Sequence, residues 1–86
     1  MPYSDIMTDE IGKNRKIDPM LAHSLIKQES RYQKGRVSKV GAIGLMQLMP
    51  YTARALARDM KMQAPQVSDL MQPEINIKLG VRYMED

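Results

Sequence analysis

Cysteine, tryptophan and phenylalanine are absent from this sequence of 86 residues, and histidine occurs once, as His23. Without cysteine the chain forms no disulfide, no thiolate metal site and no cysteine nucleophile, and one histidine is too few for a multi-histidine metal centre. Ser-His and Cys-His catalysis are disfavoured for the same reason. We therefore expect a protein that works without a metal or another cofactor.

Long apolar runs are also missing. No segment approaches the roughly 20 consecutive apolar residues of a membrane-spanning helix, so we expect no membrane span. Residues 1–10 include acids at the positions where a signal peptide needs cations and then an apolar stretch. This predicts that any export signal lies outside the chain.

The composition supports one small core. Hydrophobic residues make up 43% of the sequence, and nine of the residues are methionines. A chain of this length has room for a single domain but not for a second core, so residues 1–86 are treated as one unit. The core must be built on aliphatic side chains and on methionine, which adapts to irregular gaps.

The net charge of +3 is unevenly distributed along the chain. Residues 13–39 contain eight Lys and Arg side chains against two acids, Asp18 and Glu29, which is a local excess of six positive charges. Such an excess favours an anionic partner, for example a nucleic acid, an acidic membrane surface or an acidic polysaccharide. An ordinary solvated basic face fits the same composition equally well, because charge alone names no partner.

Apolar periodicity and capping signals predict an all-α domain of about four helices. The clearest signal is Asp18 followed by Pro19, which is a capping residue and then proline at the first helical position. Three glycines between residues 32 and 44 interrupt the periodicity there and predict a loop. The expected helices cover residues 4–12, with Ser4 as N-cap, 19–31, 51–62 and 73–84, and residues 68–71 are expected to form one further turn.

One acid lies at a position expected to be apolar. Glu29 follows Ala22, Leu25 and Ile26 at helical spacing, which places its carboxyl on the face expected to be buried. A carboxyl among aliphatic side chains prefers its neutral form and can donate a proton near neutral pH, as a general acid does. Alternatively, Glu29 lies at the helix end in solvent or pairs with a cation such as Arg31. Most glycosidases use a second carboxylate, and no obvious one is present, so both interpretations stay open.

Several longer stretches have a distinctive order and spacing. They are QESRY at 28–32, VSKVGAIGLMQLMP at 37–50 and NIKLGVRY at 76–83, with IDP at 17–19 and TA at 52–53 in the same order. Together they resemble the soluble lytic transglycosylase (SLT) domain, which has a goose-type lysozyme-like fold, over nearly the whole chain.

The resemblance implies an enzyme that cleaves the β-1,4 bond between N-acetylmuramic acid (MurNAc) and N-acetylglucosamine (GlcNAc) in peptidoglycan and leaves a 1,6-anhydro sugar. In that family the Glu of the Glu-Ser pair is the single acid/base. It corresponds to Glu29 here, and this removes the need for a second carboxylate.

The resemblance also implies a substrate-binding set. By the same correspondence Ser38 lies close to the catalytic Glu, although Lys39 replaces the proline that usually follows this serine. Gln47 and Met49 line the sugar groove, the first through amide hydrogen bonds and the second through apolar contact. Without the resemblance, Ser38 is interpreted as a residue that stabilises a turn and Met49 as core.

The family domain continues past residue 86, through another helix and an AYNAG-like segment that this sequence lacks. The resemblance therefore implies a partial SLT domain, truncated on its C-terminal side, that works on peptidoglycan glycan strands in the cell envelope, in the periplasm or outside the cell. The alternative function is a catalytically weak or inactive module for peptidoglycan binding or assembly. Nucleic acid is not expected as a partner, because the basic stretch has no aromatic residue beyond Tyr32.

The last expected helix is apolar around more than one stripe, which predicts burial from two directions. The preceding helices can cover one direction, and the missing part of the family domain would cover the other. We therefore expect an exposed apolar patch, and self-association or pairing with a complementary chain, through Ile77, Val81 and Met84.

Overall fold

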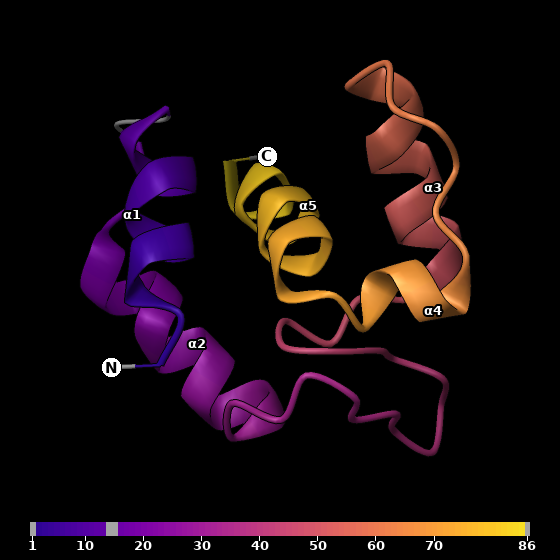
Figure 1. Cartoon of the computed structure of the whole chain (residues 1–86), viewed down its shortest axis with the longest axis horizontal. Coiled ribbons are helices and arrows are strands. Elements are labelled where there is room, and N and C mark those ends of the chain that lie inside the picture. The colour runs from indigo at the N-terminus through magenta and orange to yellow at the C-terminus, as the bar shows by residue number, and fades with distance from the viewer. Residues whose placement is uncertain (1, 14–15, 86) are drawn as a thin grey trace.

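The computed structural model of the chain describes residues 2–13 and 16–85. Within these ranges the protein is built from helices joined by loops, which confirms the predicted all-α class (Figure 1). None of the described helices is long and apolar enough to cross a membrane. The helices are α1 (Ser4–Gly12), α2 (Pro19–Ser30), α3 (Pro50–Asp59), α4 (Val67–Leu70) and α5 (Pro73–Glu85), of which α4 is the single further turn expected near residues 68–71.

The first two helices begin with different local signals. At α2 the Asp18 carboxylate accepts a hydrogen bond from the Met20 amide at 2.9 Å, and Pro19 occupies the first turn, as predicted. At α1 the prediction of Ser4 as N-cap is wrong. Tyr3 precedes the helix in the left-handed conformation, without a capping side-chain bond, and Ser4 is already the first helical residue.

The boundaries of α3 differ from the expected 51–62 at both ends. The helix begins at Pro50. Proline has no amide hydrogen, and an amide hydrogen in the first turn has no acceptor within the helix, so proline fits well at this position. It ends at Asp59, since Lys61 adopts the left-handed conformation with φ 57° and stops the helix. The Met62 amide then donates back to the Ala57 carbonyl at 2.8 Å, which satisfies a carbonyl that the helix end leaves free.

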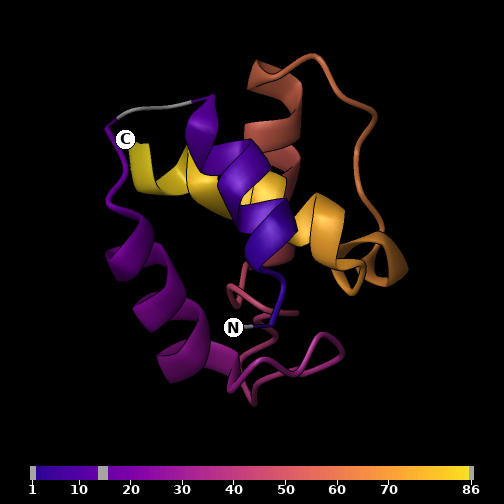
Figure 2. The ribbon, with the colours of Figure 1, turned by 60° about the vertical axis from the view of Figure 1, so that its left-hand side comes forward.

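α5 is the central helix, with α1 on one side and α3 and α4 on the other (Figures 1 and 2). An apolar cluster lies on each side of it. Towards α1, Ile77 packs in one cluster with Met7. Towards α3 and α4, Leu79 packs in a second cluster with Leu56 and Leu70. The broad apolar surface predicted for this helix is therefore used to join the two halves of the fold.

This packing removes the expected association surface. Ile77 is fully buried, Val81 is 3% exposed, and Met84 is partly buried against the same cluster. Both apolar sides of α5 are covered within one chain, by α1 on one side and by α3 and α4 on the other. The exposed apolar patch predicted at these residues is therefore wrong, and self-association stays a prediction.

A close approach joins α5 to the segment before α3. Gly80 has no side chain, and Met46 fills the space beside it, so that a Cβ at Gly80 would collide with the Met46 sulfur. Met46 is itself buried, in the cluster that also contains Ala22 and Ile26 of α2. Glycine at position 80 therefore allows α2, α5 and the connecting loop to meet in one core.

Candidate functional site

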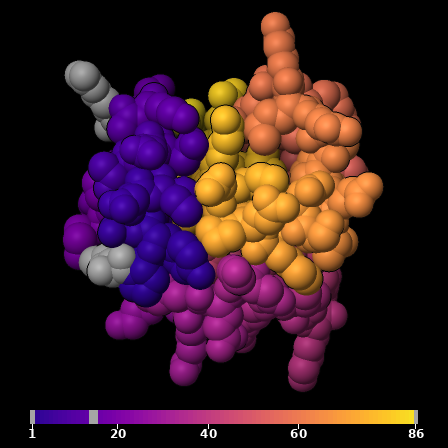
Figure 3. Space-filling model, in the orientation of Figure 1, coloured from indigo at the N-terminus to yellow at the C-terminus, as the bar shows by residue number. Residues whose placement is uncertain are grey.

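Residues 36–49 form a compact loop at one end of the bundle, between α2 and α3 (Figures 1 and 3). Two isolated β-bridges hold the 36–49 loop together, one between Val37 and Ile43 and one between Ile43 and Leu48. Ile43 and Leu48 exchange backbone hydrogen bonds at 2.9 and 3.0 Å, and the Gly44 amide donates to the Arg36 carbonyl at 2.8 Å. The loop predicted from its glycines is thus ordered by its own backbone, and it contains three of the four predicted site residues.

The Ser38 side chain closes a turn inside this loop. Its hydroxyl oxygen accepts a hydrogen bond from the Ala42 amide at 3.0 Å, and the Ser38 amide donates to the Ala42 carbonyl at 2.8 Å. These contacts are those of the turn-stabilising interpretation. The hydroxyl proton has no acceptor among the described residues, so the same side chain can still donate one hydrogen bond to a ligand.

Gln47 adopts the left-handed conformation, with φ 50°. Its side-chain nitrogen donates to the Arg36 carbonyl at 3.1 Å and to the Gly44 carbonyl at 3.0 Å. The two carbonyl acceptors show which end of the Gln47 side-chain amide is the nitrogen, because the amide oxygen at that position would lie against two carbonyl oxygens. The side-chain oxygen has no donor among the described residues, so Gln47 offers a ligand a hydrogen-bond acceptor.

Met49 lies at the end of the loop and is half-buried. A Cβ at Gly41 would lie 4.0 Å from the Met49 methyl carbon, and Gly41 has φ 95°, a conformation that favours glycine. The Gly41 amide also donates to the Ser38 carbonyl at 3.0 Å. The structure therefore brings Ser38, Gln47 and Met49 into one loop with a shared backbone framework.

The inner side of the loop packs on α2. Leu45 is fully buried and Met46 is 5% exposed, and both share a cluster with Ala22 and Ile26 of the helix. Arg31 follows α2 in the left-handed conformation, with φ 52°, and turns the chain out of the helix. The last turn of α2 and the loop are thus held by the same core.

Glu29 lies in that last turn and is exposed, which corrects its predicted place on the buried face. Among the described residues no ion pair is formed by Glu29, so the proposed pairing with Arg31 is not present either. The apolar arc of α2 is broad, and only one side of it meets the core, so that Leu21 is 59% exposed while His23 is buried. The buried residues of α2 are Ala22, His23, Ile26 and Ser30.

A concavity of about 670 Å³ lies along the exposed side of α2 and continues past its end. Two of its lining residues, Lys27 and Arg31, are cations, and none is an acid. This charge favours an anionic ligand. The lining residues are Ser24, Lys27, Gln28, Arg31 and Tyr32.

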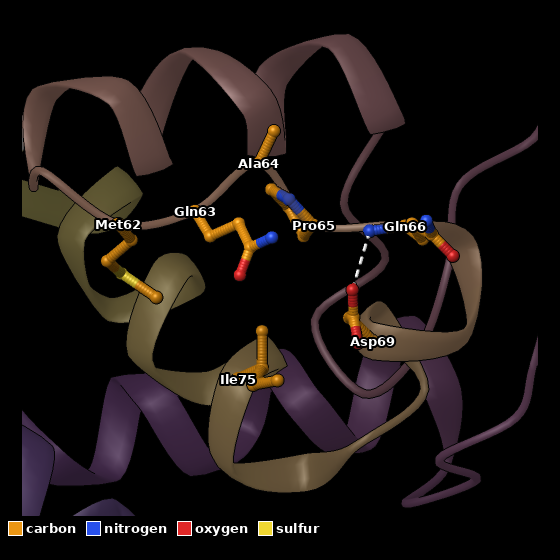
Figure 4. Close-up of a pocket in the computed structure, with 7 residues that line it drawn as sticks. All are labelled: Met62, Gln63, Ala64, Pro65, Gln66, Asp69 and Ile75. Atoms are coloured by element: carbon orange, nitrogen blue, oxygen red, sulfur yellow. Dashed lines mark hydrogen bonds between the residues drawn. The ribbon is translucent and has the colours of Figure 1, made fainter.

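A second concavity, of about 450 Å³, lies between residues 62–66 and the start of α5 (Figure 4). Its carboxylate, Asp69, accepts a hydrogen bond from the Gln66 amide at 2.7 Å and so completes the cap of α4. Neither concavity is lined by Ser38, Gln47 or Met49. The candidate site therefore rests on the family resemblance at Glu29 and in the 36–49 loop.

A buried side-chain amide on α5 forms hydrogen bonds to the 36–49 loop, and sequence analysis missed it. Asn76 is fully buried, and its side-chain oxygen accepts a hydrogen bond from the Met46 amide at 2.8 Å. Its side-chain nitrogen donates to the Ile43 carbonyl at 2.9 Å and to the Leu70 carbonyl at 2.8 Å. The one available signal was an amide side chain between two isoleucines, Ile75 and Ile77.

The sequence profile of the transglycosylase SLT domain matches residues 6–86 of this chain. The chain belongs to that family. The resemblance inferred from residues 28–32, 37–50 and 76–83 is thereby confirmed. This SLT chain is 40% identical over 80 residues to the endo-type membrane-bound lytic murein transglycosylase A of Klebsiella pneumoniae subsp. pneumoniae, and the alignment covers 91% of the chain and 39% of that relative.

Two solved structures are similar to the SLT chain over most of its length. One is the 70 kDa soluble lytic transglycosylase of Escherichia coli, with a TM-score of 0.88 and 31% identity over 95% of this chain and 13% of that protein. The other is an inactive mutant of the lytic transglycosylase Slt of Pseudomonas aeruginosa, in which a glutamate is replaced by glutamine. Its TM-score is 0.84, with 33% identity over 96% of this chain and 14% of that protein. The predicted SLT fold is therefore confirmed, and the chain spans less than half of each relative.

Proposed function

We propose that residues 1–86 form a partial catalytic domain of a peptidoglycan lytic transglycosylase that acts in the cell envelope, in the periplasm or outside the cell. The observation that supports this most is the SLT match over residues 6–86, together with 40% identity to a lytic murein transglycosylase. The substrate is the glycan strand of peptidoglycan. The reaction cleaves the MurNAc-GlcNAc β-1,4 bond and forms 1,6-anhydro-MurNAc.

In the proposed mechanism Glu29 is the only acid/base. Its carboxyl group protonates the glycosidic oxygen as the bond to the MurNAc anomeric carbon breaks, and the N-acetyl group of the substrate assists at that carbon. The carboxylate then takes the proton from the C6 hydroxyl, whose oxygen bonds to the anomeric carbon and closes the anhydro ring. No water is consumed, and Glu29 ends protonated as it began. The inactive glutamate-to-glutamine mutant of the Pseudomonas aeruginosa relative supports this role by analogy.

The 36–49 loop supplies complementary groups for a glycan in this proposal. The Gln47 side-chain oxygen accepts from a sugar hydroxyl or acetamido N–H, and the Ser38 hydroxyl donates to a sugar or carboxyl oxygen. Met49 adds apolar contact with a sugar ring. Acceptor, donor and apolar groups within one short loop are what recognition of an N-acetylated sugar requires.

Cleavage by this chain is tested directly on purified sacculi. We expect the turbidity of the suspension to fall and anhydro-muropeptides to appear in the mass spectrum of the soluble products. The alternative, a binding or assembly module, is favoured by the basic concavity along α2. A chain that pellets with sacculi and releases no anhydro product would establish that alternative and contradict the enzyme proposal.

Gln47→Gly is expected to weaken binding of a soluble peptidoglycan glycan fragment about 2- to 10-fold, the value of one net hydrogen bond. Glycine adopts the left-handed conformation of position 47 freely, so the substitution removes the side chain without adding backbone strain. Isothermal titration calorimetry measures the change. The matched control is Lys61→Gly, which alters another exposed left-handed residue, after α3, and should leave the affinity unchanged. Equal affinities for both variants would remove Gln47 from the binding set.

A further inference from the structure

The side chain of Asn76 lies where α5, α4 and the 36–49 loop meet. Its oxygen is bonded to the Met46 amide, and its nitrogen to the carbonyls of Ile43 and Leu70, at 2.8 to 2.9 Å. Both amide protons and the oxygen are thus paired with backbone groups of two segments that are distant from each other in sequence. Such bonds are strong in a buried site, where no water replaces a lost partner.

The Asn76 side-chain amide occupies the space that a side chain at Gly44 would fill. A Cβ at Gly44 would collide with the Asn76 side-chain nitrogen and with the Leu70 carbonyl oxygen. Gly44 also has φ 80°, a conformation that favours glycine. The backbone of the loop therefore approaches α5 closely at this point, and Asn76 bonds the residues on either side of Gly44.

Gln47 belongs to the same turn. Residues 44–47 connect the bonded pair formed by Ile43 and Leu48, and the Gln47 amide donates to the Gly44 carbonyl at 3.1 Å. The Gln47 side-chain nitrogen bonds the same carbonyl at 3.0 Å. Any shift of residues 43–46 relative to α5 therefore moves the Gln47 side chain with them.

We propose that Asn76 is a positioning residue that fixes residues 43–47 against α5 and α4, and thereby sets the place of the Gln47 acceptor. The proposal deepens the proposed function and rests on it for the role of the loop in glycan binding. Asn76 itself is fully buried and does not touch the glycan. It acts through the Met46 amide and the Ile43 carbonyl.

Asn76→Asp tests the proposal with almost no change of shape. The carboxylate keeps an acceptor for the Met46 amide, but it places an oxygen against the carbonyls of Ile43 and Leu70 in place of the donor. We expect binding of the glycan fragment to weaken about 2- to 10-fold, as for Gln47→Gly, because Asn76→Asp acts through the Gln47 acceptor. In nuclear magnetic resonance spectra the Met46 amide should exchange faster, and the Gln47 side-chain NH₂ signals should move towards those of a free amide.

Acidification gives a second measure in the same variant. A protonated carboxyl regains one O–H donor, so the Gln47 NH₂ signals of Asn76→Asp should return towards their wild-type positions as the pH falls. The matched control is Ile77→Val, the adjacent and equally buried α5 residue. It shares a cluster with Met7 and Met46, and the substitution removes one methyl group but no hydrogen bond. This control should lower the melting temperature. It should leave the loop signals near their wild-type positions and the affinity within twofold of wild type.

Asn76→Ser, which is smaller and stays neutral, covers the case in which the aspartate variant does not fold. Loss of all helical structure in both variants would overturn the proposal, because Asn76 would then stabilise the whole fold and not the loop. Unchanged Met46 exchange and Gln47 signals in a folded Asn76→Asp would overturn it as well. Altered loop signals with unchanged glycan affinity would support the positioning role of Asn76 and count instead against the proposed binding role of Gln47.

Discussion

Replacing Glu29 with glutamine is expected to reduce the release of anhydro-muropeptides from sacculi about 100- to 10,000-fold, which is the range attributed to general acid/base catalysis. The amide keeps the shape of the side chain but can neither give nor take the proton. Because Glu29 is exposed and forms no ion pair among the described residues, its replacement should leave helical content and glycan affinity nearly unchanged. Mass spectrometry of the soluble products measures the effect.

The matched control is Glu74→Gln, which neutralises an exposed glutamate in the first turn of α5. This variant should release as much anhydro product as the wild type. Substantial release by Glu29→Gln, at the level of the control, would show that the proton is handled by another group. A parallel loss of affinity in Glu29→Gln would instead point to a binding role for the carboxylate.

Gly44→Ala is expected to destabilise the chain by about 2 to 5 kcal/mol. The left-handed backbone at this position, with φ 80°, costs a non-glycine residue about 1 to 2 kcal/mol. The new methyl group also meets the Asn76 side chain and a backbone oxygen, and such overpacking costs about 1 to 3 kcal/mol. A chain of this size has a total stability of about 4 to 13 kcal/mol, so a large part of it should be lost. Urea unfolding followed by circular dichroism measures the change.

Substitutions at two other glycines separate the backbone cost from the overpacking cost. Gly41 has φ 95°, and a Cβ there would make only an ordinary contact with the Met49 methyl carbon at 4.0 Å, so Gly41→Ala should show the backbone cost alone, about 1 to 2 kcal/mol. At Gly35 a Cβ meets nothing within 4 Å and the backbone is not left-handed, so Gly35→Ala should be neutral or stabilise by up to about 1 kcal/mol. Equal stabilities of the Gly41 and Gly44 variants would mean that the Asn76 contact yields without cost.

Local signals predicted the elements of this fold well. The Asp18-Pro19 pair located the start of α2 because the cap and the fixed backbone of proline act within one turn. The rotation of α2 was predicted less well, since Leu21, Ala22, Leu25 and Ile26 span a broad arc. Which part of such an arc is buried depends on the neighbouring elements, and their positions are not encoded in the spacing of one helix.

In the candidate site, too, features encoded in a local stretch were predicted and contacts between distant segments were not. The site residues of the 36–49 loop were assigned by resemblance from one continuous stretch, and its glycines predicted a loop, but the left-handed conformation of Gln47 was not predicted. The contact from Asn76 to Met46 joins positions 30 residues apart, and it was invisible to any local pattern. The burial of Val81 was missed for the same reason, because α1, which lies at the other end of the sequence, covers it.

The packing of Met46 against Gly80 also bears on the response of the chain to oxidants. Peroxide adds an oxygen to methionine sulfur and makes the side chain polar, and the reaction requires access to the sulfur. Met20 is 61% exposed and is open to this reaction, whereas Met46 is 5% exposed and its sulfur faces the backbone of Gly80. A sulfoxide at Met46 can therefore form only when the loop has moved away from α5, and its presence would mark chains in which the 36–49 loop had opened.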